Sequence, residues 1–101
     1  MFIEFEVCIG RGDVARDANV TLIAPPGFAF LNSPKGPRLS KKEYANYVCT
    51  QLGCGDIKSP IARCKKVNLK VPSQPNNYDL IYRAYCEGFD SNYQEFEVIV
   101  E

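Results

Sequence analysis

The sequence contains no histidine and no tryptophan, and it has only one methionine. Without histidine the chain cannot build a Ser-His-Asp or Cys-His nucleophile pair, and it cannot hold a metal ion through imidazole. No glycine-rich segment has the spacing of a phosphate-binding loop or of a dinucleotide-binding turn. We therefore predict a protein that is not an enzyme and that needs neither a cofactor nor a metal ion.

Long apolar runs are also missing. The chain has 101 residues, and no stretch of it approaches the roughly 20 apolar residues of a membrane-spanning helix. Residues 1–6 enter an alternating pattern that includes acidic positions, which is not typical of a secretion signal. We expect one domain over residues 1–101 that is a module of a larger chain and is not inserted into a membrane.

The net charge is zero, but charges of the two signs are unevenly distributed. Residues 35–70 contain nine basic and two acidic residues, whereas residues 71–101 contain one basic and six acidic residues. This separation favours either contact with other protein modules or copies of the chain, or compensation within the folded domain. An isoelectric point of about 6.3 argues against nucleic-acid binding, for which a strongly basic surface is typical.

The chain has five cysteines, which is more than a domain of this length ordinarily contains. Structural zinc sites and thioredoxin-like dithiols commonly use a Cys-x-x-Cys pair, which is absent here. Two disulfides with one cysteine left over are the favoured interpretation, with buried thiols as the main alternative. Disulfides would place the domain outside the cell or at the cell surface. The candidates are Cys8, Cys49, Cys54, Cys64 and Cys86.

The spacing of the cysteines leaves several pairings open. Cys49 could pair with Cys54 around a predicted helix end, or either of them could pair with Cys64. Cys8 and Cys86 lie in predicted strands, and a bond between them would join the first strand to a late one. The odd cysteine would then come from the 49–64 group.

Alternating apolar and polar residues predict strands along most of the chain. The pattern covers residues 2–9, 19–24, 66–71, 78–86 and 93–100. A proline-rich segment, residues 25–38, indicates ordered loop or edge chain that is held to the core by three apolar residues: Phe28, Phe30 and Leu31. These elements predict a mainly β fold, an antiparallel immunoglobulin-like β-sandwich of five to seven strands.

One short helix is predicted within the sandwich, at about residues 40–52. Ser40 and Glu43 have the spacing of a capping box, and Gly53 stands where a helix commonly ends. Between these signals, apolar residues recur at helical spacing: Tyr44, Tyr47, Val48 and Leu52. We expect this helix to bury its tyrosines, which is a further reason not to predict a stacking surface for nucleic acid.

Residues 8–21, CIGRGDVARDANVT, contain two short motifs of extracellular proteins. Arg11, Gly12 and Asp13 form the tripeptide that many adhesion proteins present to integrins. Glycine and aspartate are also the residues that turns recruit, so we favour a structural turn over an adhesion site. Asn19 begins an Asn-Val-Thr acceptor sequence for N-glycosylation, which predicts a glycoprotein where the compartment supplies the glycan.

The segment NVTLIAPPGFAF at residues 19–30, the cysteines, and the terminal strand pair YDLIYRAYCEGF and YQEFEVIV carry a resemblance. The chain is similar to the short β-sandwich ectodomain modules of large cell-surface and ciliary-hair proteins of protists. The resemblance implies a structural or adhesive domain and brings no catalytic residues with it. We therefore expect a disulfide-stapled extracellular interaction module of a surface or filament-like assembly. The alternative is a small secreted protein that binds a glycan or a receptor.

Overall fold

The computed structural model has eight β-strands and one 3-10 turn in the part of the chain that it describes. That part comprises residues 2–9, 15–31, 33–37, 39–57 and 63–101, without the side chains of residues 5, 9, 63 and 64. The strands are β1 (Phe2–Ile9), β2 (Ala15–Ala24), β3 (Ala29–Leu31), β4 (Val48–Ile57), β5 (Arg63–Lys70), β6 (Asn76–Cys86), β7 (Phe89–Asp90) and β8 (Gln94–Val100).

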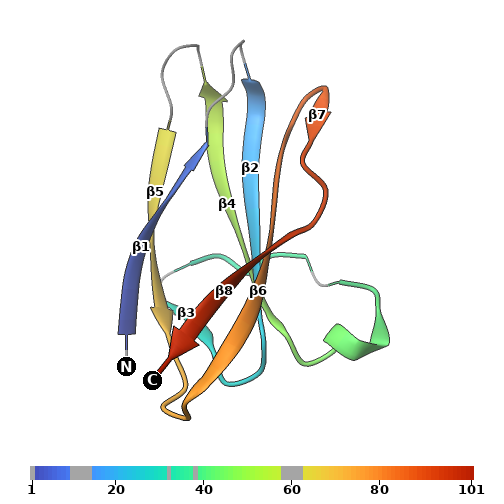
Figure 1. Cartoon of the computed structure of the whole chain (residues 1–101). Helices are drawn as coiled ribbons and strands as arrows, with labels where there is room; N and C mark the ends of the chain where they lie inside the picture. The colour runs from blue at the N-terminus through green and yellow to red at the C-terminus, as the bar shows by residue number, and fades with distance from the viewer. Residues whose placement is uncertain (1, 10–14, 32, 38, 58–62) are drawn as a thin grey trace.

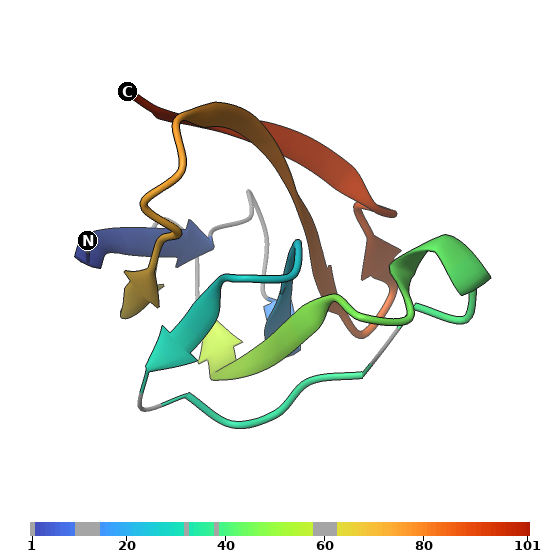
Figure 2. The ribbon, with the colours of Figure 1, turned by 90° about the horizontal axis from the view of Figure 1, so that it is seen from below.

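The strands form two antiparallel sheets (Figure 1). In the smaller sheet β5 lies between β1 and β3, and in the larger sheet β2 lies between β4 and β6. Both β7 and β8 pair with the other edge of β6. Figure 2, seen from below, shows the two sheets around the space that the core side chains occupy. The antiparallel β-sandwich predicted from the sequence is confirmed, with eight strands in the described residues rather than five to seven.

The central strand of the larger sheet, β2, carries a bulge near its start. Its register with β4 shifts between Ala15 and Asn19, and Asp17 there has a φ of 52°. Aspartate tolerates this left-handed conformation better than most residues. The bulge keeps Ala15 and Ala18 in the same buried cluster although they are three residues apart.

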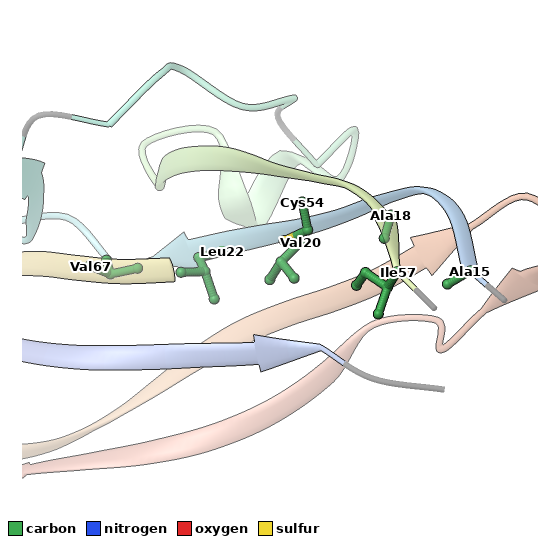
Figure 3. Close-up of a cluster of buried hydrophobic side chains, with 7 residues drawn as sticks. All are labelled: Ala15, Ala18, Val20, Leu22, Cys54, Ile57 and Val67. Carbon is green, nitrogen blue, oxygen red and sulfur yellow. The ribbon is translucent and has the colours of Figure 1, made fainter. Parts of the chain in front are cut away.

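The core between the sheets consists of two clusters of buried residues. The first joins β2, β4 and β5 (Figure 3) and comprises Ala15, Ala18, Val20, Leu22, Cys54, Ile57 and Val67. The second comprises Ala24, Phe28, Leu69, Val71, Leu80 and Val100. Phe30 and Phe96 pack against both clusters. Phe28 is thus buried, as predicted, and anchors the proline-rich segment.

The opposite face of β2 is also covered. Thr21 and Ile23, which alternate with the core residues Val20 and Leu22, are 2% and 0% exposed. The segment after β3 closes the outer edge of β4, where the Gly36 amide donates to the Cys49 carbonyl oxygen at 3.1 Å. The Thr50 hydroxyl, at the same edge of β4, donates to the Pro34 carbonyl oxygen at 2.6 Å. The edge of β4 is therefore occupied by the chain itself.

The prediction of a helix at about residues 40–52 is wrong. The chain forms one 3-10 turn, η1 (Lys42–Tyr44), which has Lys41 as its N-cap and no side-chain capping hydrogen bond. β4 then begins at Val48, and Val48 to Leu52 pair residue by residue with β2. Val48 and Leu52 are four residues apart, a spacing that fits one face of a helix and one face of a strand equally well. Residues 48–52 pair with the buried strand β2, and this pairing selects the strand over the helix.

Replacing Gly36 by alanine should destabilise the fold. A Cβ at this position would lie 2.6 Å from the carbonyl carbon of Thr50, which is backbone and cannot turn aside. We expect Gly36→Ala to lower the free energy of unfolding by about 1–3 kcal/mol, measured by urea denaturation. Gly53→Ala is the matched control, since the nearest atom to its added Cβ is 3.7 Å away. An equal effect of both changes would contradict the prediction.

Candidate functional site

The two motifs singled out near the N-terminus have different outcomes. Arg11, Gly12 and Asp13 lie outside the described residues, and so does the predicted turn. Asn19 lies in β2, between Gly53 of β4 and Tyr85 of β6. Its Nδ2, the atom to which a glycan would be attached, donates a 2.7 Å hydrogen bond to the Asp17 carbonyl oxygen. A glycan at this position would be attached to an amide that already donates this bond within a paired central strand.

Cys8 and Cys64 are brought together by the strand register. They are directly opposite each other in the antiparallel ladder of β1 and β5. Cys8 is exposed next to Val7, which packs against the core, so Cys8 faces away from the core. The sequence offered no signal for this pair, because it depends on the alignment of two strands more than fifty positions apart.

The other pairings considered from the sequence do not fit the strands. Cys49 and Cys54 are five residues apart on β4, which is about 16 Å in an extended strand, whereas disulfide-bonded Cα atoms lie within about 7 Å. Cys8 and Cys86 lie in different sheets, and Cys8 faces away from the core that Cys86 packs against. The register gives Cys64 the neighbour Cys8 rather than Cys49 or Cys54.

The best-formed polar site lies on the outer face of the larger sheet. We define the Arg83 face by the residues of β2, β4, β6 and the β7–β8 region that gather there: Asn19, Gln51, Arg83, Tyr85, Asp90 and Tyr93. Asn19 pairs with Tyr85 and Thr21 pairs with Arg83, while Tyr85 pairs with Asp90. The Gln51 side-chain amide donates to the Tyr85 hydroxyl across β2. This bond passes over Thr21, which explains the burial of a polar residue on an outer face.

Arg83 is the centre of this face. Its Nε donates to Asp90 Oδ1 at 2.9 Å, and its Nη2 donates to Asp90 Oδ2, so the pair is bidentate. The guanidinium carbon lies 5.0 Å from the centre of the Tyr85 ring and 5.4 Å from that of the Tyr93 ring. Cation–π contacts of this length restrain the side chain further. Two rings and one carboxylate therefore fix the position of a single guanidinium.

The loop that follows Asp90, the last residue of β7, is ordered by hydrogen bonds of its own. The Asn92 amide donates to Asp90 Oδ1 at 2.8 Å, and the Ser91 hydroxyl accepts from the Ala84 amide at 2.9 Å. Asn92 has a φ of 59°, which asparagine adopts readily. The Asp90 carboxylate is thus held by the Asn92 backbone amide as well as by Arg83.

The electrostatics of the pair follow from these contacts. The hydrogen bond from Arg83, and after it the one from the Asn92 amide, hold the pKa of the Asp90 carboxyl below its ordinary value. The hydrogen bonds with Asp90 and then Tyr93 raise the pKa of Arg83. Both groups stay charged at neutral pH, and their charges offset each other. The face presents fixed donors and acceptors with little net charge at its centre.

Two hollows flank Arg83 along β6. One, of about 400 Å³, is lined by Arg83, Tyr85, Cys86, Gly88, Phe89 and Asp90. The other, of about 310 Å³, includes Leu39, Lys41, Tyr44, Ile81, Tyr93 and Glu95. Both volumes are at the lower end of the range of ligand-binding pockets. The second hollow lies between η1 and the sheet, so the chain from 39 to 44 forms one of its walls.

Sequence reasoning missed this face, although one signal was present. The alternation of β6 put Arg83 and Tyr85 on the side opposite Leu80 and Tyr82, which marks them as outward residues. The sequence did not show that Asp90 and Tyr93 return from the next turn to meet them.

Comparison with known proteins gives no relative: no family model matches the chain, and no curated protein matches it. In the described residues no helix has the length and apolarity needed to cross a membrane. The same part of the chain has no group of three or more side chains arranged to hold a metal ion. The arrangement at Arg83 is suited to binding, since its charged groups are fixed by each other.

The Asp90 carboxyl should titrate below the ordinary aspartate value of about 3.9. Its pKa is depressed in the folded state, so the stabilisation by the ion pair is present above the unfolded value and is lost as the pH falls through the folded one. Carboxyl ¹³C NMR titration of the chain measures this directly. In Arg83→Gln the midpoint should move back towards the ordinary value, and an unchanged midpoint would show that Arg83 is not the cause.

Proposed function

We propose that this chain is a non-enzymatic extracellular module, stapled by a disulfide, that acts through contacts in a surface or filament-like assembly. Its partners are other protein modules or copies of itself. The observation that carries the proposal is the register of Cys8 and Cys64. A staple at this position suits a domain that is exposed to oxidising conditions.

The backbone geometry supports a bond between these two cysteines. Directly opposed residues of antiparallel strands have Cα atoms about 4.5–5.5 Å apart, and disulfides span about 4.4–6.8 Å. Cys8 and Cys64 satisfy this condition because they are directly opposite each other in the ladder.

The Arg83 face supports the second half of the proposal, a role in contact. Tyrosine and arginine are enriched at protein interfaces, where rigid side chains lose little entropy on binding. Tyr93, an aromatic residue of this face, is 46% exposed. The resemblance to ectodomain modules, stated from the sequence, points in the same direction.

The alternative function is that of a small secreted protein that recognises a glycan or a receptor. The observation that favours it is the pair of hollows beside Arg83. Flat contact surfaces between modules do not require such depressions, whereas small-ligand sites are concave. Both functions would use the Arg83 face.

The staple is tested by peptide mapping of the full chain without reduction. We expect one linked peptide pair containing Cys8 and Cys64. Cys8→Ser, Cys64→Ser and the double variant should each lower the free energy of unfolding by about 2–4 kcal/mol, with the double variant no worse than either single one. Alkylation of all five cysteines before reduction would overturn both the staple and the extracellular proposal.

Self-association is tested by sedimentation velocity at low and high salt. The basic middle and acidic end of the chain predict association that weakens as ionic strength rises. The described ion pairs compensate part of the charge internally: Lys66 with Glu4 at 3.9 Å, and Arg83 with Asp90. Sedimentation that is independent of salt would leave other modules, rather than copies of the chain, as the partners.

A further inference from the structure

We infer that the Arg83 face binds a neutral saccharide, with one sugar unit in each hollow beside Arg83. This inference rests on the proposed function, in which the face is a contact surface. It adds the chemical class of the ligand.

Arg83 is not placed to capture an anion. Its charge is already matched by the bidentate carboxylate of Asp90, and its guanidinium lies near two aromatic rings, those of Tyr85 and Tyr93. The wall of the second hollow includes Lys41 as well as Glu95, so its two charges offset each other. A sulfate, phosphate or carboxylate would have to displace Asp90 to reach Arg83, so the site favours a ligand without charge.

The hydrogen-bonding groups that remain at the pair fit vicinal hydroxyls. A guanidinium has five N–H donors, of which Asp90 takes two and the hydrogen bond with Tyr93 takes a third. A carboxylate has about four acceptor positions, and Arg83 and the Asn92 amide occupy three. The pair therefore presents a donor and an acceptor side by side. Each hydroxyl of a diol both donates and accepts, so neighbouring hydroxyls satisfy both groups together.

The tyrosines supply the apolar part of such a site. Tyr93 is 46% exposed beside the second hollow, and Tyr85 lines the first. Tyrosine has an apolar ring and a polar tip, which matches a sugar ring with its C–H face and its hydroxyl edge. Gln51 holds the Tyr85 hydroxyl and Arg83 contacts both rings, so little order has to be gained on binding.

The position of the hollows indicates more than one sugar unit. They include successive outward residues of β6: Ile81 in one hollow, and Arg83 and Tyr85 in the other. A linear oligosaccharide lying along β6 would place one unit in the hollow at Ile81 and the next unit in the hollow at Arg83. A monosaccharide would fill one hollow and leave the other open.

The test is titration of the ¹⁵N-labelled full chain with cellotetraose, a neutral tetrasaccharide with equatorial hydroxyls, followed by NMR and calorimetry. We expect shifts confined to the Arg83 face, and tighter binding than with glucose. Tyr93→Ala should weaken binding by about tenfold or more, and so should Arg83→Lys, which keeps the charge but loses the fork. Phe2→Ala, which removes a 65% exposed aromatic residue from the other sheet, is the matched control and should bind normally.

Two further measurements decide whether the ligand is neutral and whether it binds at the Arg83 face. A heparin-derived tetrasaccharide should bind no more tightly than cellotetraose, and tighter, salt-sensitive binding would overturn the neutral-ligand inference. Absence of binding to cellotetraose, or binding that survives Tyr93→Ala in a variant with normal thermal unfolding, would also overturn it. The Cys8–Cys64 peptide map is independent of these results, so failure of the ligand class and failure of the extracellular module can be told apart.

Discussion

Strand β2 is hydrogen-bonded along both edges and covered on both faces, so its central residues have almost no contact with water. Val20 and Leu22 face the core, while Thr21 and Ile23 on the other side are just as deeply buried. The chain after β3 closes the other edge of β4, where Gly36 pairs with Cys49. Pairing of Val48 to Leu52 with β2 excludes a helix at those residues.

The same constraint makes the Arg83 face rigid. β6 is tied to β2 over five residue pairs, from Asn19 with Tyr85 to Ile23 with Ile81. The side chains of Arg83 and Tyr85 therefore start from a backbone that cannot slide without exposing Ile23. Their final positions are set by Asp90 and Gln51, which reach them from the β7 turn and from β4. A face built in this way would lose little side-chain entropy if it bound a ligand.

The strands were predictable because their signal is local. Val67 and Leu69 alternate with charged or polar neighbours, and this pattern places them in the core without knowledge of any partner. Leu52 and Val48 show the limit, since their spacing fits two structures and only the ladder with β2 selects one. The Cys8–Cys64 pair and the Arg83–Asp90 pair were out of reach for the same reason. Both depend on where one segment is placed against another, which alternation does not encode.

The first strand begins and the last strand finishes at the same end of the sandwich (Figure 1). Phe2 is paired with Lys70 and Val100 with Asn76, so each terminal strand is held at that end by an outermost residue pair. Ladder hydrogen bonds in antiparallel sheets run across the strands. A force that separates the two ends would therefore load these bonds one after another, as a zip opens, instead of all together in shear. A covalent link from Cys8 to Cys64 would stop such peeling of β1 before its last residue.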